Sequence, residues 1–406
     1  MSDTTKPHLA ILGAGPTGLE AALAATEAGV PFTLYEAAAE VGANVRAWGH
    51  VRLFTPWDLD VSPRMRRHLD AAGVAVPSGD DCPTGRELAE RLLAPVAALP
   101  EVAPHLRLST RVVAVGREGL LKHEEIATAE RGRRPFRLLV ADRSGGERIE
   151  HAGVVIDATG TYGHPNSLGD GGIPAPGERE LAGSIRRDLP DFAREAEGWA
   201  GKTVLLAGAG HSAETAAREL AELARRAPGT RVIWALRREA PAVTPDVAAT
   251  GDPLPERARL EKAAAELAAG ASPHVEVLHG VAIEELRPKA DGGVEVVLRN
   301  GAGPGLLAVD RVLALTGYVG DHGLYRQLQV HECYATCGPI QLSGALLGAG
   351  AGDCLGQQSH GAEVLKNPEP NFYILGIKSY GRNNTFLLRV GWQQVEEVFG
   401  LIAGAA

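Results

Sequence analysis

Two glycine-rich segments with the same spacing constrain the fold of this chain more than any other feature. The first, "GAGPTG", spans residues 13–18, and the second, "GAGHSA", spans residues 208–213. Each follows a short apolar run and precedes a segment with helical periodicity, at 19–29 and at 212–227. A strand, a G-x-G-x-x-G turn and a helix form the phosphate-binding part of a dinucleotide-binding βαβ unit. The chain is therefore predicted to contain two such units.

In the first segment, each glycine has a physical role. Gly13 permits the tight turn, Gly15 lets the backbone approach a pyrophosphate, and Gly18 lets the helix pack closely on the strand. The helix N-terminus then offers free N–H groups and a positive dipole end to the phosphates. The next apolar strand ends in Glu36, whose carboxylate can accept hydrogen bonds from both hydroxyls of an adenosine ribose. The alternative is a glycine-rich turn in an unrelated α/β unit.

The second segment keeps this plan but ends differently. Gly208, Gly210 and Ala213 take the three small positions, and alanine at the third still permits close packing. The following strand ends in Arg237 and Arg238. Guanidinium groups bind phosphate in a fork geometry, so this strand end favours a ribose with a 2′-phosphate, and hence NADP(H) over NAD(H). The alternative is that both arginines form a solvated strand end.

Composition limits the class of protein. The chain has 406 residues, of which 45% are apolar and 22% charged, which is typical of a soluble protein of two or three domains. A net charge of −9 argues against nucleic acid and membrane surfaces as partners, and no apolar stretch has the length of a membrane span. The N-terminus lacks a secretory signal pattern, and four cysteines suit a reducing cytoplasm. We therefore expect a cytoplasmic protein.

The chain repeats one plan after each glycine segment. Strand-like runs lie at 106–115, 134–145 and 147–163, and again at 275–286, 292–303 and 306–320. Both series contain a Thr-Gly pair after an apolar strand. Such small residues allow the backbone to lie close to a cofactor, or allow the chain to pass from one domain to the other. We predict an α/β fold of two Rossmann-like dinucleotide-binding domains with inserted β-meanders, the second nested in the first. The predicted boundaries divide the chain into 1–165, 166–319 and 320–406.

The combination of "GAGPTG", Glu36, "DATGTYGHPN", "GAGHSA" and "DRVLALTGY" resembles the flavoproteins that have two dinucleotide-binding domains. Among these the chain is most similar, over most of its length, to the class B flavin monooxygenases, which include the flavin-containing monooxygenases and N-hydroxylases. The second-loop pattern of that family, G-x-G-x-S-A, matches residues 208–213. Its Asp…Thr-Gly-Tyr element matches Asp310 and residues 316–318, although Leu315 stands where alanine is more usual.

The resemblance implies that the first glycine segment holds FAD and the second holds NADPH. It also implies that the C-terminal strand and helix return to the FAD domain, where the helix N-terminus faces the flavin. The expected FAD-binding residues are Gly13, Ala14, Gly15, Pro16, Thr17, Gly18, Glu36, Val112, Ala158, Thr159, Gly160, Gly376, Lys378 and Gly391. The expected NADPH-binding residues are Gly208, Gly210, His211, Ser212, Ala213, Arg237, Arg238, Thr316 and Gly317. Lys378 has the alternative of an exposed loop lysine.

Two missing motifs bear on the chemistry. The Baeyer–Villiger fingerprint F-x-G-x-x-x-H-x-x-x-W is not present before the second glycine segment, which disfavours conversion of ketones to esters. No C-x-x-C occurs, whereas thioredoxin reductases need such a pair for exchange with the flavin. Cys333 and Cys337 are a candidate redox pair, with two ordinary turn thiols as the favoured alternative. No motif predicts a metal site or a catalytic triad.

Two further segments are candidates for holding substrate. The first, Val45 to Pro63, has aromatic residues that could exclude water and basic residues that could contact phosphate, with ordinary core packing as the alternative. The second, Gly344 to Pro370, is glycine-rich with little regular pattern, and long irregular loops are often functional. Its titratable candidates are Asp353 and His360, each with an ordinary surface role as the alternative.

The resemblance implies an NADPH- and O2-dependent monooxygenase, in which a flavin C4a-hydroperoxide oxygenates an N or S atom of a small molecule. The cofactor would carry this chemistry, and the protein would supply a dry pocket. One alternative is a nicotinamide-dependent flavoprotein reductase or dehydrogenase without oxygen insertion. Another is a redox-sensing module that binds FAD and NADP(H) with little turnover. The expected partners are a small-molecule substrate and O2, and a homodimer is a possible assembly.

Overall fold

The computed structural model describes residues 6–239, 253–301, 303–348 and 357–404. The chain forms two compact units. Unit 1 comprises the residues up to His164 together with those from Val319 onward, and unit 2 comprises Pro165–Tyr318. Both divisions lie one residue before the boundaries predicted from the sequence. Unit 2 is thus inserted into the chain of unit 1.

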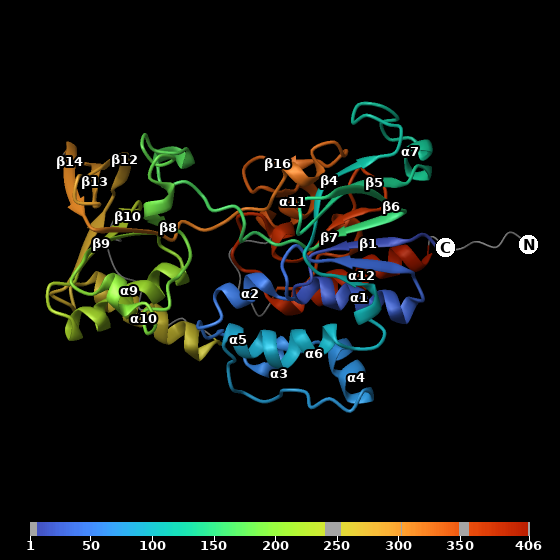
Figure 1. Ribbon diagram of the computed structural model, residues 1–406, viewed down its shortest axis with the longest axis horizontal. Coiled ribbons are helices and arrows are strands. Elements are labelled where there is room, and N and C mark those ends of the chain that lie inside the picture. Colours follow the sequence, from blue (N-terminus) through green and yellow to red (C-terminus); the bar gives the residue numbers. More distant parts are fainter. Residues whose placement is uncertain (1–5, 240–252, 302, 349–356, 405–406) are drawn as a thin grey trace, which may run out of the picture. The chain divides into compact units, whose positions relative to one another are not determined.

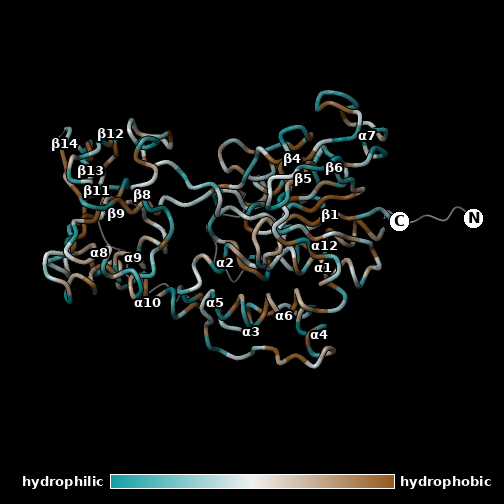
Figure 2. Tube along the Cα trace, viewed as in Figure 1, coloured by the Kyte–Doolittle hydropathy of each residue, from teal (hydrophilic) through white to brown (hydrophobic). Residues whose placement is uncertain are grey.

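Unit 1 is built on a parallel sheet with the strand order β18-β7-β1-β2-β3 (Figure 1). Its strands are β1 (Leu9–Leu12), β2 (Phe32–Tyr35), β3 (Leu106–Arg107), β7 (Val154–Asp157) and β18 (Phe372–Ile374). Strands β1, β7 and β18 are buried along their whole length. Helices or strands cover both faces of such a strand, which explains why the sequence shows continuous apolar runs rather than alternation. Figure 2 shows this apolar character along β1.

One face of this sheet is covered by helices. Helix α1 (Pro16–Ala28) packs against α12 (Leu388–Gly404) and α4 (Pro63–Ala71). Further helices of unit 1 are α2 (Ala43–Ala47), α3 (Trp57–Asp60), α5 (Gly85–Leu88), a π-helical turn (Ala89–Leu93) and α6 (Ala94–Ala97). The first glycine segment therefore opens a helix that lies at the centre of the unit.

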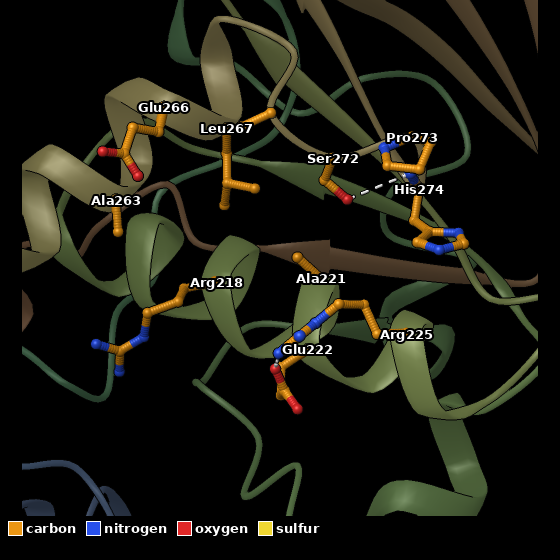
Figure 3. Close-up of a pocket in the computed structure, with 11 residues that line it drawn as sticks. Arg218, Ala221, Glu222, Arg225, Ala263, Glu266, Leu267, Ser272, Pro273 and His274 are labelled. Carbon is orange, nitrogen blue, oxygen red and sulfur yellow. Dashed lines mark hydrogen bonds and ion pairs between the residues drawn. The ribbon is translucent and has the colours of Figure 1, made fainter.

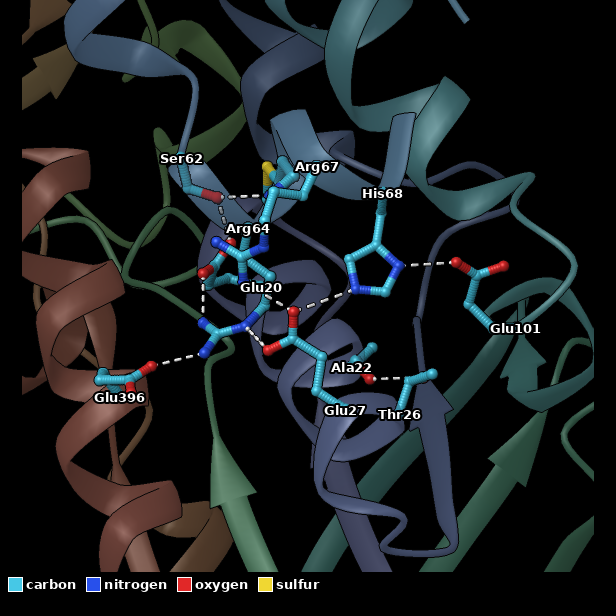
Figure 4. A network of polar contacts seen from close by, with 11 residues as sticks. Glu20, Ala22, Thr26, Glu27, Ser62, Arg64, Arg67, His68, Glu101 and Glu396 are labelled. Atoms are coloured by element: carbon cyan, nitrogen blue, oxygen red, sulfur yellow. Dashed lines mark hydrogen bonds and ion pairs between the residues drawn. The ribbon is translucent and has the colours of Figure 1, made fainter. Parts of the chain in front are cut away.

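A charged cluster joins three of these helices (Figure 4). Arg64 on α4 donates to Glu20 at 2.6 Å and to Glu27 at 2.7 Å, both on α1, and also pairs with Glu396 on α12. Glu20 is 1% exposed and also accepts a hydrogen bond from Ser62 at 2.5 Å. A buried charge requires such partners, because taking an ion out of water is costly.

The opposite side of unit 1 carries an antiparallel meander. It consists of β4 (Thr110–Arg117), β5 (Phe136–Asp142) and β6 (Glu147–Ala152), with α7 (Ala129–Arg133) between the first two strands. The inserted meander is confirmed, although the predicted runs at 106–115 and 147–163 each divide in two. The start of the first run forms β3 and the middle of the second run forms β7, and both strands belong to the parallel sheet. The rest of the first run and the start of the second run form β4 and β6 of the meander.

Unit 2 repeats the plan. Its parallel sheet has the order β11-β10-β9-β15-β8, and a separate antiparallel meander has the order β12-β13-β14. The sheet contains β8 (Ile185–Arg186), β9 (Thr203–Ala207), β10 (Arg231–Leu236), β11 (Val275–His279) and β15 (Arg311–Ala314). The meander contains β12 (Ala282–Pro288), β13 (Val294–Asn300) and β14 (Gly303–Val309). The helices are α8 (Ala196–Trp199), α9 (His211–Arg226) and α10 (Pro255–Ala268). The predicted α/β fold of two Rossmann-like domains is confirmed.

The C-terminal part of unit 1 adds a small hairpin and one helix before the last strand. These are β16 (Glu332–Cys333), β17 (Gly338–Pro339) and α11 (Ile340–Gly348). Short 3₁₀ helices lie at Ala103–His105, Asp170–Gly172, Ala182–Ser184, Gly323–Tyr325, Ala362–Leu365 and Gly376–Tyr380. Among the described residues, no helix is both long and apolar enough to cross a membrane.

Candidate functional site

The first glycine segment is shaped to leave room for a ligand. Gly13 has φ +96°, and a Cβ atom there would lie 2.7 Å from the Ala158 carbonyl oxygen. A Cβ atom at Gly18 would lie 1.8 Å from the Gly13 carbonyl oxygen, so the helix start packs directly on the turn. Gly15, by contrast, faces open space and is the N-cap of α1, with no side-chain cap. The open position coincides with the N–H groups that bind phosphate in such helices.

Glu36 lies beside this turn. One carboxylate oxygen accepts the Ala14 N–H at 2.9 Å and the other accepts the Ala38 N–H at 2.9 Å. Parallel strands end at the same edge of a sheet, which brings the end of β2 to the glycine turn that follows β1. The carboxylate is therefore held in place by backbone donors, and its contact with a ribose stays a prediction.

Segments from the far end of the sequence meet the same turn. A Cβ atom at Gly376 would lie 2.8 Å from the Thr17 hydroxyl oxygen, and one at Gly391 would lie 3.0 Å from the same atom. Gly376 begins the 3₁₀ helix after β18 and has φ +74°, while Gly391 lies in the first turn of α12. Three of the segments expected to bind FAD are thus brought together by the fold.

The remaining expected FAD residues divide into two groups. Ala158, Thr159 and Gly160 follow β7, next to Gly13, as the parallel sheet requires. Val112 lies instead in β4 of the meander, at a register shift, and packs at the edge of the core there. No described contact joins Val112 to the glycine turn.

Lys378 is buried, so the alternative of an exposed loop lysine is wrong. Its side chain is 1% exposed, and its Nζ lies 2.6 Å from Asp157 Oδ2, 2.8 Å from the Asp321 carbonyl oxygen and 3.2 Å from the Thr159 hydroxyl. The 3₁₀ helix at Gly376–Tyr380 carries the lysine to the end of β7. Sequence reasoning missed Asp157, although an acid that ends an apolar strand in "VVIDATG" was an available signal.

The second glycine segment has a similar shape. Gly208 has φ +141°, and a Cβ atom there would lie 2.3 Å from the Leu315 carbonyl oxygen and 3.2 Å from the Ala213 side chain. Gly210 faces open space and caps α9, again without a side-chain cap. The Trp234 indole donates to the Gly208 carbonyl at 2.9 Å, a brace that the spacing of the motif did not reveal. The turn is therefore closely packed where it follows β9, and it faces open space where α9 begins.

Acidic side chains lie beside this second turn. His211 and Glu214 belong to the first turn of α9, and Glu261 on α10 lies 3.4 Å from the His211 ring. Burial raises the pKa of Glu214, His211 lowers it, and the charge of Glu261 raises it further. The sequence could not show this cluster, because Glu261 comes from a helix far along the chain.

The two arginines that favoured NADP(H) follow β10 directly. Arg237 and Arg238 are both exposed. Residues 240–252, which come next, lie outside the described chain. The end of β10 adjoins β9, which leads into the glycine turn, so the arginines stand at the correct edge of the sheet. The phosphate role of the two arginines stays a prediction, with a solvated strand end as its alternative.

Thr316 and Gly317 lie where the chain leaves unit 2. The Thr316 hydroxyl donates to the Asn166 carbonyl at 2.8 Å, and the Asn166 amide donates to the Thr316 carbonyl at 3.0 Å. Pro165 and Tyr318 form an antiparallel bridge beside them. These hydrogen bonds and the bridge join the two ends of unit 2. Gly317, in the segment that leaves unit 2, has φ +84°.

The first candidate substrate segment is largely packed into the core. Trp57 is 4% exposed beneath the Arg91 guanidinium, which lies 5.2 Å from its ring centre, and Trp48 packs against Gly85. Asp60 is 2% exposed, and burial raises its pKa to about 7, although a hydrogen bond from Thr55 at 2.6 Å opposes this. The core-packing alternative therefore describes Trp48 and Trp57, and Asp60 is a titratable group that the sequence reasoning missed.

The second candidate substrate segment is more regular than predicted. Its first residues complete α11, and a 3₁₀ helix lies at Ala362–Leu365. His360 is exposed, and Asp353 lies outside the described residues. A cavity of about 400 Å³ lies elsewhere, between α9 and α10 in unit 2 (Figure 3). It is lined by the later turns of α9, such as Arg218 and Arg225, so it is not the predicted nucleotide site.

Comparison with known proteins assigns the family. Residues 7–333 match the pyridine nucleotide-disulphide oxidoreductases. The chain belongs to this family. It is accordingly an FAD-dependent oxidoreductase of the pyridine nucleotide class, which confirms the expected FAD and, at this level, the resemblance to two-domain flavoproteins. No curated protein matches the chain.

Solved structures with similar folds include three kinds of enzyme. The bacillithiol disulfide reductase Bdr (YpdA) from Bacillus cereus has a TM-score of 0.68 at 18% identity, covering 99% of this chain and 100% of that one. The ornithine N-hydroxylase of Kutzneria sp. 744 has 0.63 at 15%, covering 98% and 99%. The S-allyl-L-cysteine S-oxygenase of Allium sativum has 0.55 at 16%, covering 98% and 77%. At such identities the likeness concerns the fold alone, and both reductases and oxygenases share it.

Proposed function

We propose that this protein is an NADPH-dependent flavoenzyme that transfers one oxygen atom from O2 to an N or S atom of a small molecule. The observation that carries the cofactor part is the pair of open glycine turns with different strand ends. Glu36 beside the first turn suits an unphosphorylated ribose, and Arg237 with Arg238 beside the second suits a phosphorylated one. One dinucleotide needs only one such turn.

The residues of the first turn fit FAD. Gly15 leaves open space at the uncapped start of α1, where N–H groups would bind the pyrophosphate. Glu36 would accept from the ribose hydroxyls, and the N-terminus of α12 would place a positive dipole end near Thr17. When bound, FAD would accept electrons from NADPH and pass them to oxygen.

The residues of the second turn fit NADPH. Gly210 faces open space at the start of α9. Arg237 and Arg238 are exposed at the end of the neighbouring strand. These residues bind and orient the donor and need no acid–base chemistry of their own.

We favour oxygen transfer over disulfide reduction because the chain has no C-x-x-C pair, which thioredoxin reductases need for exchange with the flavin. All four cysteines of the chain, at 82, 333, 337 and 354, lie outside residues 165–318. The resemblance to flavin-containing monooxygenases and N-hydroxylases, which rests on "GAGHSA" and "DRVLALTGY", supports the same outcome. The chemistry would then rest on the cofactors, with the chain excluding water.

The proposal is tested by reducing the flavin with NADPH without oxygen and then mixing it with isotopically heavy O2 and a probe substrate. An amine such as L-ornithine and a thioether such as methionine are suitable probes, since the fold occurs in enzymes that act on such groups. We expect one heavy oxygen atom in the product for each NADPH consumed. Consumption of NADPH with peroxide as the sole product across amines and thioethers would contradict oxygen transfer.

Disulfide reduction is the second candidate, and one specific feature favours it. Cys333 and Cys337 lie in one hairpin of unit 1, and Bdr, which has a similar fold, is a disulfide reductase. In that case, the NADPH-reduced enzyme would be reoxidised without oxygen by a small disulfide. Stopped-flow mixing of the reduced enzyme with glutathione disulfide or with O2 separates the two candidates directly.

A further inference from the structure

Lys378 is a buried cation whose hydrogen-bonding capacity is fully used within the protein. An ammonium group has three N–H donors. Its Nζ atom has three acceptors, which are Asp157 Oδ2 at 2.6 Å, the Asp321 carbonyl oxygen at 2.8 Å and the Thr159 hydroxyl oxygen at 3.2 Å. The lysine side chain is 1% exposed and that of Asp157 is 0% exposed. Lys378 therefore keeps no donor for a bound cofactor.

The hydrogen bonds of Thr159 agree with this count. Its hydroxyl donates to Asp157 Oδ1 at 2.7 Å, and its N–H donates to the same oxygen at 3.1 Å. Because the hydroxyl proton points to Asp157, the hydroxyl oxygen is free to accept from Lys378. One carboxylate and one ammonium thus orient the turn at 158–160, and the carbonyl of Ala158 in this turn lies against Gly13.

Two glycines allow the lysine to reach this position. Gly376 begins the 3₁₀ helix of Lys378 with φ +74°, and a Cβ atom there would lie 2.8 Å from the Thr17 hydroxyl oxygen. A Cβ atom at Gly320 would lie 2.7 Å from Cγ of Lys378. The stem of the lysine is therefore packed against the segment at 319–321, and its helix is packed against the first glycine segment.

An aromatic ring borders the ammonium group. Lys378 Nζ lies 5.0 Å from the ring centre of Tyr325, which is 4% exposed. The face of such a ring attracts a cation, and the ring excludes water from that side. The Tyr325 hydroxyl donates to Glu332 at 2.5 Å, which fixes the ring in place. Hydrogen bonds in such a dry environment are stronger than in water, so the ammonium holds its three acceptors firmly.

We propose that Lys378 is a positioning residue for FAD. Its ammonium joins the turn after β7, the 3₁₀ helix at Gly376–Tyr380 and the segment at 319–321. The first two of these contain residues expected to bind FAD, so the lysine holds them in the geometry that receives the cofactor. It acts through Thr159 and Gly376 and makes no contact with FAD itself, which differs from the expectation of a direct contact. The inference rests on the proposed binding of FAD at the first glycine turn.

The test measures the dissociation constant of FAD for the apoprotein, prepared by removing flavin from the full-length enzyme. Lys378→Met keeps the length of the side chain and removes its charge, and we expect the dissociation constant to rise at least tenfold in a fluorescence titration. The matched control is Arg117→Met, which breaks another fully buried ion pair, that of Arg117 with Glu369 at 2.6 Å. Glu369 precedes β18, whereas Lys378 follows it. The control should lose stability in urea and still bind FAD within twofold of the wild type.

A second variant separates positioning from stability. Adding Asp157→Asn to Lys378→Met removes the carboxylate that the first change leaves uncompensated, so most of the lost stability should return. Affinity for FAD should stay at least tenfold below that of the wild type, because the group that joins the three segments is still missing. Circular dichroism checks that each variant is folded.

The proposal is overturned if FAD affinity returns together with stability, since Lys378 would then serve the fold alone. It is also overturned if Lys378→Met binds FAD as tightly as the wild type. Both of these results leave the proposed function intact, because they concern one side chain only. A wild-type apoprotein that does not bind FAD would instead contradict the proposed function and this inference together.

Discussion

Asp60 shows how one buried side chain can make the stability of the fold depend on pH. Its pKa is raised to about 7, chiefly by burial, so the folded protein keeps a proton that the unfolded chain loses near pH 4. Between these two values the unfolded state binds fewer protons, and stability therefore falls as pH rises. About three pKa units correspond to a loss on the order of 4 kcal/mol.

We expect Asp60→Asn to flatten this pH dependence, because asparagine keeps the acceptor for Thr55 but does not ionise. The variant should match the wild type near pH 4.5 and exceed it in free energy of unfolding at pH 8. Urea unfolding at both pH values measures the difference. Asp70→Asn, at an exposed position in the following helix, is the control and should keep the wild-type slope. An unchanged slope in Asp60→Asn would show that Asp60 is not the titrating group.

Sequence reasoning reached some residues and not others for a physical reason. Gly13, Gly15 and Glu36 were found because their roles depend on local spacing within one βαβ unit, and the structure places them at one turn. For Lys378 the sequence left both a place near the flavin and an exposed loop open, because its partner Asp157 lies more than two hundred positions away. Burial of a charge depends on such distant partners, and no local pattern reveals them.

At the scale of elements, Arg64 joins α4 to α1 and α12. It pairs with a nearly fully buried carboxylate, that of Glu20, which has no other positive partner among the described contacts. Removing one member of a buried ion pair leaves the other charge without compensation, which costs about 3–5 kcal/mol. The cluster therefore fixes the position of the helix that the first glycine segment opens.

We expect Arg64→Ala to lower the free energy of unfolding by about 3–5 kcal/mol, measured by urea titration. The control is Arg67→Ala in the same helix, since Arg67 pairs with Glu27 at 2.7 Å but is 60% exposed. An exposed pair contributes about 0–1 kcal/mol, so the control should change little. Equal losses from the two substitutions would contradict the role of burial.

The central elements were largely predictable, because strands such as β1 and β9 are short apolar runs and a helix follows each glycine turn. The division of the runs at 106–115 and 147–163 between two sheets was not predictable. β3 and β7 read as continuations of the meander, and only the pairing partners show that they belong to the parallel sheet. Pairing is a property of the whole unit rather than of the segment.

At the scale of the molecule, the two glycine turns belong to different compact units, so each nucleotide should bind without the other. We expect Gly15→Val to yield protein without FAD, because the side chain would fill the open space at the start of α1, yet with NADP⁺ binding retained. Absorbance and isothermal calorimetry measure the two separately. Retained stoichiometric FAD would contradict the assignment of the first turn.

The reciprocal change concerns the second unit. Arg237→Ala combined with Arg238→Ala should weaken binding of NADPH at least tenfold while leaving that of NADH nearly unchanged, since only NADPH carries the 2′-phosphate. Flavin content should stay at the wild-type level. An unchanged ratio of the two dissociation constants would show that both arginines belong to a solvated strand end and do not bind the phosphate.

The antiparallel bridge between Pro165 and Tyr318 has a consequence for how this architecture can be rearranged. A segment whose two ends already touch behaves as a cassette, because it can be cut out or exchanged without rerouting the host chain. Grafting 165–318 from a relative with another coenzyme preference would alter the donor while leaving the acceptor chemistry in place. The electron donor of such an enzyme could therefore change in evolution independently of the product.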